Sequence, residues 1–137
     1  MSGQRTAAVP AEAAQLAALT QFLRDFWSDE RLPPDHALSF ELALEEIFVN
    51  AVTHGAPQGN TPQVAVTLSL RGRELSMTLE DDGPPFDPLS LPPPDVTARL
   101  SERRQGGLGV FLVRQLMDDV SYQRVATRNR LTMSKQI

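Results

Sequence analysis

The chain has 137 residues, of which 41% are hydrophobic and 22% are charged, and this is the size and composition of one globular domain. Its formal net charge of -4 argues against a basic nucleic-acid-binding surface, and the absence of cysteine excludes disulfides, thiolate zinc sites and cysteine nucleophiles. The apolar runs are too short to span a bilayer and the first residues lack a signal pattern, so we expect a cytoplasmic protein.

Helical spacing of apolar residues dominates the first part of the chain. A short strand is expected near residues 7–9, and Pro10 stands where it can open a helix. Apolar residues recur at helical spacing from residue 11 to residue 27. A second helix is predicted from about Asp35, its N-cap, to Thr53. Its apolar stripe is expected to contain Leu38 or Phe40, and then Leu44, Ile47, Phe48 and Ala51.

Alternating apolar residues predict two β-hairpins in the rest of the chain. Residues 64–70 and 75–79 alternate on either side of Arg71-Gly72, and residues 120–126 and 131–137 are expected to form the second pair of strands. A third helix is predicted over residues 110–117, between the hairpins. We therefore expect residues 1–137 to form a single domain, an α+β two-layer sandwich with three main helices on one face of a mostly antiparallel sheet.

Two polar residues of the second predicted helix are candidates for chemistry. Glu46 and Asn50 lie four residues apart, so their side chains share one helix face. The carboxylate can accept a proton, and the carboxamide oxygen can bind a hard cation such as Mg²⁺. Taken alone, two solvated residues on a helix surface are the more common explanation. Glu41 and Glu45 are expected to be solvated.

Two glycine-containing segments extend this pattern. Asp81 ends a predicted strand and can accept a hydrogen bond from an exocyclic amine, while Gly83 lets the backbone approach a flat ring; a plain Asp-Gly turn is the alternative. Residues 106–109 open a helix whose free amides can bind phosphate, with Arg103 and Arg104 just upstream; a flexible hinge is the alternative. A chance match of all three segments, in this order and on these predicted elements, is much less probable than a chance match of any one of them.

The three segments resemble the motifs of the ATPase superfamily shared by gyrase, histidine kinases, mismatch-repair proteins and a heat-shock chaperone, which has the Bergerat fold. Within it, the chain looks most like the small anti-sigma-factor serine/threonine kinases of bacteria. The matching segments are EIFVNAVTHG at residues 46–55, DDGPPFDP at 81–88 and GGLGVFLVRQLMD at 106–118.

The resemblance implies a role for each motif residue. Glu46 would be the general base, Asn50 the Mg²⁺ ligand, and Asp81 the residue that binds the adenine amine beside Gly83. Residues 84–105 would form the lid over ATP. The residues that would contact the nucleotide are Asn50, Asp81, Gly83, Arg104, Gly106, Gly107, Leu108 and Gly109. The chain departs from many relatives near its last strands, where Arg130-Leu131-Thr132 stands in place of a Gly-Thr pair.

The function implied by the resemblance is that of an anti-sigma factor with kinase activity. It would transfer the γ-phosphate of Mg·ATP to an anti-sigma factor antagonist and would sequester a sigma factor, as a homodimer formed through the N-terminal strand and first helix. His54 is expected to be structural and not phosphorylated. A non-catalytic, ATP-dependent partner-binding module and a plain ATPase are the alternatives. The presence of Glu46 favours catalysis, because pure binding needs no base.

Overall fold

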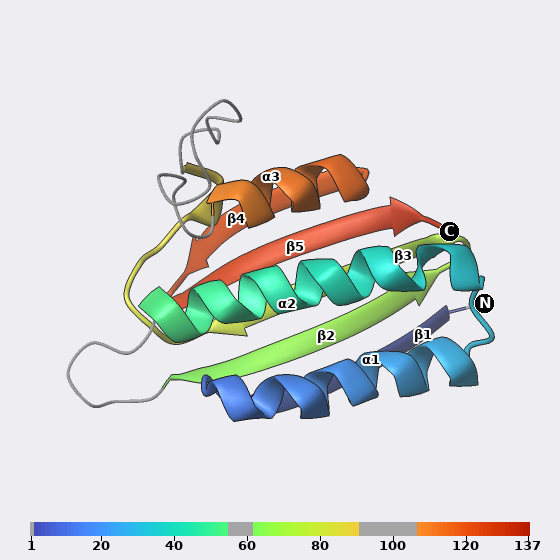
Figure 1. The fold of residues 1–137 in the computed structure, drawn as a ribbon, viewed down its shortest axis with the longest axis horizontal. Helices are drawn as coiled ribbons and strands as arrows, with labels where there is room; N and C mark the ends of the chain where they lie inside the picture. The colour runs from blue at the N-terminus through green and yellow to red at the C-terminus, as the bar shows by residue number, and fades with distance from the viewer. Residues whose placement is uncertain (1, 55–61, 91–106) are drawn as a thin grey trace.

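Three helices and five strands make up the part of the chain that the computed structural model describes, residues 2–54, 62–90 and 107–137 (Figure 1). In chain order the elements are β1 (Ser2–Pro10), α1 (Leu16–Asp29), α2 (Ala37–His54), β2 (Gln63–Arg71), β3 (Glu74–Asp81), α3 (Gly107–Leu116), β4 (Asp119–Val125) and β5 (Arg128–Gln136). Three single-turn 3₁₀ helices join some of them, at Ala13–Gln15, Pro34–His36 and Pro88–Ser90.

The strands form one antiparallel sheet in the order β1-β2-β3-β5-β4. The two predicted hairpins are its β2–β3 and β4–β5 pairs, and the Gly72 that turns the first of them has a φ of 61°, a conformation that glycine adopts without strain. The long chain excursion between β3 and β4 places β5 directly beside β3. As a result, Asp81, the last residue of β3, lies opposite Asn129 of β5.

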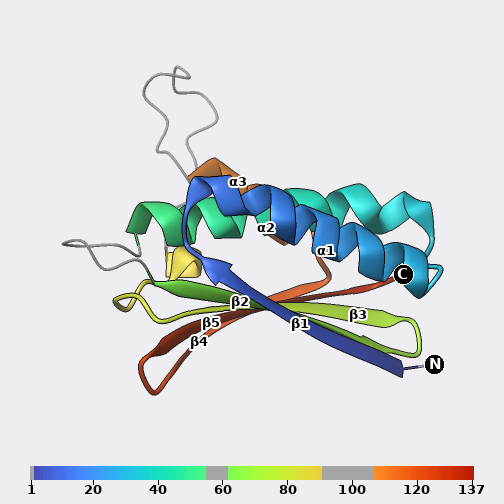
Figure 2. The same ribbon diagram turned by 90° about the horizontal axis from the view of Figure 1, so that it is seen from below.

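The helices cover one face of the sheet and leave the other face uncovered (Figure 2). Burial alternates along β2, with the even-numbered residues from 64 to 70 buried. The aromatic residues Phe26, Phe40 and Phe48 meet this face from α1 and α2 and are fully buried. Hydrophobic burial between these two layers forms the core. The expected α+β sandwich, with three helices on one face of an antiparallel sheet, is confirmed.

The boundaries of several elements differ from the prediction, and β1 shows why. It runs to Pro10, which ends an edge strand, where its missing N–H costs no ladder bond. The expectation that Pro10 opens a helix is wrong. The amide of Ala11 donates to the carbonyl of Pro62 at 2.8 Å, which keeps the chain on the sheet, so α1 begins only at Leu16.

The start of α2 corrects one prediction and resolves another. Asp35 lies inside a 3₁₀ turn opened by Pro34, so the expected N-cap role of Asp35 is wrong. Of the two candidates for the first core position, Phe40 is fully buried and Leu38 is 63% exposed. The α3 helix begins at Gly107 and not at Val110, and Pro88–Ser90 forms a helical turn within the segment expected to be the lid.

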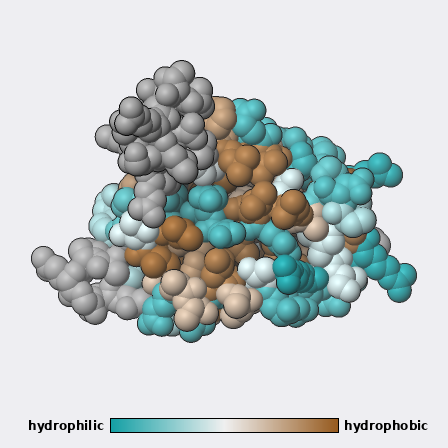
Figure 3. All heavy atoms as spheres, in the orientation of Figure 1, coloured by the Kyte–Doolittle hydropathy of each residue, from teal (hydrophilic) through white to brown (hydrophobic). Residues whose placement is uncertain are grey.

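Apolar side chains also gather on the helical face of the molecule (Figure 3). The exposed large apolar residues are Leu38 and Val49 on α2 and Phe111 and Leu112 on α3. Since α2 and α3 pack against each other, these residues lie on neighbouring elements of the same layer. Exposed apolar side chains on neighbouring helices are a candidate site of protein association.

The two faces of the sheet predict opposite responses to truncation. Leu68 is fully buried in β2, so Leu68→Ala should lower the free energy of unfolding by about 2–5 kcal/mol, because it leaves a cavity against the helices. The next residue, Ser69, points to the uncovered face, and Ser69→Ala should change stability by about 0.5 kcal/mol or less. Urea denaturation measures both, and equal losses would contradict the two-layer assignment.

Candidate functional site

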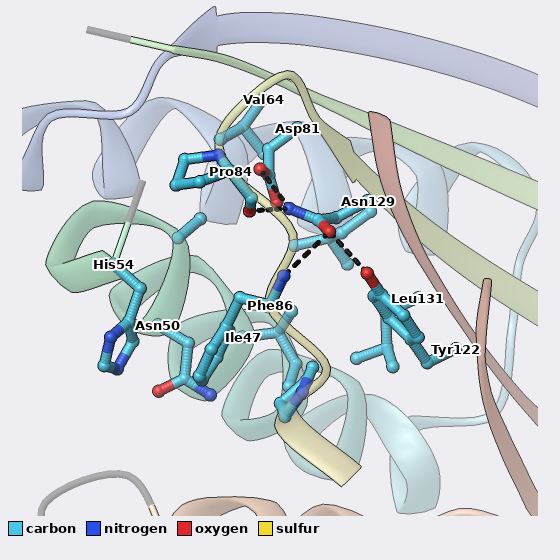
Figure 4. Close-up of a pocket in the computed structure, with 13 residues that line it drawn as sticks. Ile47, Asn50, His54, Val64, Asp81, Pro84, Phe86, Tyr122, Asn129 and Leu131 are labelled. Atoms are coloured by element: carbon cyan, nitrogen blue, oxygen red, sulfur yellow. Dashed lines mark hydrogen bonds between the residues drawn. The ribbon is translucent and has the colours of Figure 1, made fainter. Parts of the chain in front are cut away.

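A pocket opens between the C-terminal half of α2 and the ends of the central strands (Figure 4). Its apolar walls come from α2, β2, β3 and β5, and are formed by Ile47, Ala51, Val64, Leu79 and Leu131. Its polar lining comes from the same elements and consists of Asn50, His54, Asp81 and Asn129. A mostly apolar cleft with a few convergent polar groups is typical of a small-molecule site.

Asn50 is 5% exposed although it is polar, so the alternative of a solvated helix residue is wrong for this side chain. Its buried Nδ2 atom has no hydrogen-bond partner in the described part of the chain. An unpaired buried amide costs about 1–3 kcal/mol, and such a group in a native protein calls for an explanation such as a catalytic role, an ordered water or an ion. The amide can turn by 180° to present its oxygen instead, because oxygen and nitrogen have the same shape.

Glu46 lies one turn before Asn50 and faces the start of α3. A Cβ added at Gly109 would overlap the Oε2 atom of Glu46, so a larger residue there would have to displace this carboxylate. The structure thus brings together two residues that are 63 positions apart in the sequence, one from the first motif and one from the third.

The surroundings of Glu46 favour its neutral form. Partial burial raises the pKa of this carboxyl, and the neighbouring negative charge of Glu45 raises it further. Glu45 is exposed, as expected, whereas Glu41 is half-buried and accepts a hydrogen bond of 2.7 Å from Arg24, so the expectation of a freely solvated Glu41 is wrong. A partly buried carboxyl with a raised pKa is a candidate general base, and Glu46 lies next to the pocket-lining residue Ile47.

Asp81 is held at the end of β3 by two hydrogen bonds to one oxygen. Its Oδ1 atom accepts from the backbone N–H of Gly83 at 3.0 Å and from Nδ2 of Asn129 at 3.0 Å. The first bond closes a tight turn, which is the Asp-Gly turn that the sequence left open as an alternative. The turn and a binding role are compatible, because the same carboxylate also lines the pocket.

Phe86 fills much of the pocket. Its ring stacks on the imidazole of His54, with ring centroids 4.1 Å apart and planes inclined by 18° (Figure 4). The remaining cavity volume is about 30 Å³, which is enough for one or two water molecules and too small for a purine ring. A planar ligand can therefore enter only if the Phe86 ring moves. His54 has a packing role here, as its structural assignment from the sequence supposed.

Several predicted site residues fall outside the described part of the chain. These are Arg104, Gly106 and most of the predicted lid at 84–105, of which the structure describes only residues 84–90. Gly107 and Leu108 form the first turn of α3, and Gly109 is buried in it. The free amides expected at this helix start therefore stand beside Glu46. The assigned roles of these residues stay predictions.

Asn129 was not among the predicted site residues, yet it makes more side-chain hydrogen bonds than any of those that the structure describes. The one available signal was an asparagine within a strand, where this residue type is depleted. Its partners Asp81, Pro84 and Phe86 lie more than 40 positions away in the sequence, so no local pattern points to them. Arg130, Leu131 and Thr132 continue β5 beside it.

Within residues 2–54, 62–90 and 107–137, no group of three or more histidine, cysteine, aspartate or glutamate side chains is arranged to hold a metal ion. Any divalent cation at Asn50 would thus need ligands from a bound molecule or water, as is common for Mg²⁺ on phosphates. The helices of the described chain include none that is long and apolar enough to cross a membrane.

Comparison with known proteins identifies close and distant relatives. The chain is 33% identical over 114 residues to serine/threonine-protein kinase BtrW of Bordetella bronchiseptica, which covers 82% of this chain and 75% of that protein. It is 26% identical over 118 residues to serine-protein kinase RsbW of Staphylococcus aureus, with coverage of 82% and 74%.

A solved structure shares the fold. The RsbU and RsbW domains of a Mycobacterium tuberculosis protein match with a TM-score of 0.70 at 15% identity, over 98% of this chain and 32% of that one. The sequence model of the family described as "Histidine kinase-like ATPase domain" matches residues 9–135, nearly the whole chain. The protein therefore belongs to the histidine kinase-like ATPase domain family.

Proposed function

We propose that the protein is an ATP-dependent protein kinase that transfers the γ-phosphoryl group to a serine or threonine hydroxyl of a small partner protein. The observation that carries the proposal is the contact of the half-buried Glu46 carboxylate with Gly109 at the start of α3. It brings a candidate base to a helix N-terminus, where phosphate is favoured. The relatives BtrW and RsbW are named as serine or serine/threonine kinases, which supports the reaction class.

Asn50 suits the role of metal ligand in this reaction. Its carboxamide is buried, lines the pocket and has an unpaired nitrogen, so the amide is free to turn its oxygen toward a cation. Mg²⁺ keeps several waters and is held mainly by phosphate oxygens, so one protein oxygen is sufficient. When bound, the ion would neutralise charge on the transferred phosphoryl group.

Glu46 suits the role of base because of where it lies. Burial raises its pKa, which makes the ionised carboxylate a stronger proton acceptor. In phosphoryl transfer most of the work is positioning and charge neutralisation, so the base would act on the attacking hydroxyl of the partner. The amides of Gly107 and Gly109 would hold the phosphates, with Arg104 and Gly106 from the adjoining segment.

The base of the nucleotide would bind at the other end of the pocket. Asp81 would accept a hydrogen bond from the exocyclic amine of adenine, with Gly83 and its turn along the ring edge. The Phe86 ring would leave its stack on His54 to make room, and residues 84–105 would close over ATP as a lid. The backbone N–H of Phe86 is bonded to Asn129, so the ring would rotate on a backbone that is tied to β5.

The partners we propose are those of the anti-sigma-factor kinases that the chain resembles. An anti-sigma factor antagonist would be the phosphorylation substrate, and a sigma factor would be sequestered, by a homodimer formed through β1 and α1. The exposed apolar residues on α2 and α3 support association with a protein. Phe111 and Leu112 lie about one turn after the start of α3, so a partner bound there would be near the proposed phosphate site.

The second candidate function is a module that binds ATP to grip its partner without turnover. The unpaired Asn50 amide and the pocket suit nucleotide binding by either kind of protein. The two functions differ in what they require of Glu46, because only catalysis needs a proton acceptor. Incubation of the protein with labelled ATP and candidate antagonists separates them: labelled antagonist supports the kinase, and ATP-dependent capture without label supports the module.

Nucleotide binding should stabilise the fold. Mg·ATP and Mg·ADP should raise Tm, since a ligand that binds only the native state adds about 2.7 kcal/mol at 100 times its Kd. Asp81→Asn should lose most of the shift, because its amide nitrogen repels the adenine amine. The exposed neighbour Asp82 is the matched control, and Asp82→Asn should keep the shift. Scanning fluorimetry at millimolar nucleotide checks this, and an unshifted wild-type Tm would contradict the nucleotide site.

Loss of the proposed base should separate catalysis from binding. Glu46→Gln keeps the shape of the side chain but cannot take a proton, so phosphotransfer should slow by about 10²–10⁴-fold while Kd for ATP changes little. Glu45→Gln, on the adjacent exposed position, should transfer phosphate at nearly the wild-type rate. Single-turnover assays measure both variants. A Glu46→Gln enzyme with full activity would leave the partner-binding module as the better explanation.

The pH dependence should report the same group. Glu46 acts as a base only when ionised, so the rate of transfer should rise with pH through its raised pKa and level off above it. Burial is the main cause of the raised pKa and Glu45 the second, so Glu45→Gln should move the rise to lower pH. A rate profile of both proteins tests this, and a rise unmoved by the substitution would show that another group controls it.

A further inference from the structure

Asn129 is one of only two polar residues that are buried in the described part of the chain, the other being Asn50. It lies near the start of β5, directly opposite Asp81 on β3. The two residues are 48 positions apart in the sequence. Residues paired across antiparallel strands point to the same face of the sheet, so both side chains reach the pocket under α2 (Figure 4).

Every hydrogen-bonding position of the Asn129 amide is used. Its nitrogen donates to Oδ1 of Asp81 at 3.0 Å and to the carbonyl of Pro84 at 2.8 Å. Its oxygen accepts from the N–H of Phe86 at 3.1 Å, from the hydroxyl of Tyr122 and from Arg124 at 3.2 Å. The neighbours dictate this orientation, because a turned amide would set its oxygen against a carboxylate and a carbonyl.

This arrangement leaves the two oxygens of Asp81 unequal. Oδ1 already accepts from both Asn129 and Gly83, whereas the bonds between described residues include none to Oδ2. Because Oδ1 is held in place, the Oδ2 oxygen points in one fixed direction and can accept a hydrogen bond only from a donor that lies there. Because a carboxylate only accepts hydrogen bonds, it favours a ligand group that donates, such as the 6-amino group of adenine, and repels an accepting group such as the 6-oxo oxygen of hypoxanthine.

We propose that Asn129 is a positioning residue that holds Asp81 with one oxygen free for a 6-amino purine, and so sets the base preference of the site. The inference rests on the proposed nucleotide site and adds the residue that makes it selective. Without the Asn129 nitrogen, Asp81 is held only by the amide of Gly83 and can rotate away from a 6-oxo group. Asn129 would then be needed for discrimination between bases and less for binding itself.

The sharpest variant is Asn129→Asp. It keeps an oxygen toward Phe86, Tyr122 and Arg124 but replaces the nitrogen that donates to Asp81 and Pro84. The quantity to measure is the ratio of the Kd values for IDP and ADP, by calorimetry on the full chain. Wild type should prefer ADP, and Asn129→Asp should reduce that preference by about 10-fold or more, the usual effect of a lost hydrogen bond to a charged group.

Two further variants distinguish positioning from a merely structural role. Thr132→Ala removes a hydroxyl from the open face of the same strand, where it pairs with Thr78, and should leave the ratio unchanged. If Asn129 acts through Asp81, adding Asn129→Asp to an Asp81→Asn protein should not alter the ratio further. Asn129→Ala, which removes the whole amide, should give the same loss of preference as Asn129→Asp.

The outcomes separate this inference from the proposed function. Equal weakening of ADP and IDP in Asn129→Asp, with the ratio kept, would overturn the positioning role while the nucleotide site stands. A wild-type protein that binds neither nucleotide would overturn both. Folding is checked at about 10 °C, where the free energy of unfolding of many domains is near its maximum. If neither Asn129 variant folds there, Asn129 is a structural residue and the inference fails.

Discussion

The packing of α2 on the sheet is the constraint on which the rest of the structure depends. One face of this helix buries Phe40, Leu44 and Phe48 completely. Since the helical repeat fixes the angle between any two positions, burial of these residues also fixes the direction of Glu46 and Asn50. The polar groups therefore cannot move without disturbing the core, and the chemistry of the site takes its precision from hydrophobic packing.

The two ends of the pocket use polar groups in different ways. At the β3 end, Asn129 holds one oxygen of Asp81 and ties the strands to the following turn. At the α2 end, the buried Asn50 nitrogen has no partner among the described residues, and Glu46, one turn earlier on the helix, has a pKa raised by burial. A satisfied network rigidifies a site, whereas unsatisfied groups store free energy that a ligand can release. The β3 end of the pocket is thus preorganised for recognition. The α2 end contains a buried polar group whose unpaired state lowers stability and which a charged ligand could satisfy.

Two contacts connect α2 with the segments that would bind the nucleotide together with it, the start of α3 and the turn after β3. Gly109 brings the start of α3 against Glu46, and the stack of Phe86 on His54 closes the turn after β3 over the end of α2. Both contacts are made to α2, by Phe86 at the start of the predicted lid and by Gly109 just after its end. Entry of a purine ring would break the second contact, so nucleotide binding and the conformation of residues 84–90 are linked through one aromatic ring.

The sequence by itself determined the order of the elements, the two hairpins, the sidedness of the sheet and the three motifs, because these follow from local periodicity and turn residues. It also identified Glu46 and Asp81 as candidates by their place on those elements. Only the tertiary structure decided that Asn50 is buried, that Pro10 ends a strand, that Phe86 fills the pocket and that Asn129 holds Asp81. These features depend on strand register and on contacts between residues far apart in the chain, which leave no periodic pattern in the sequence.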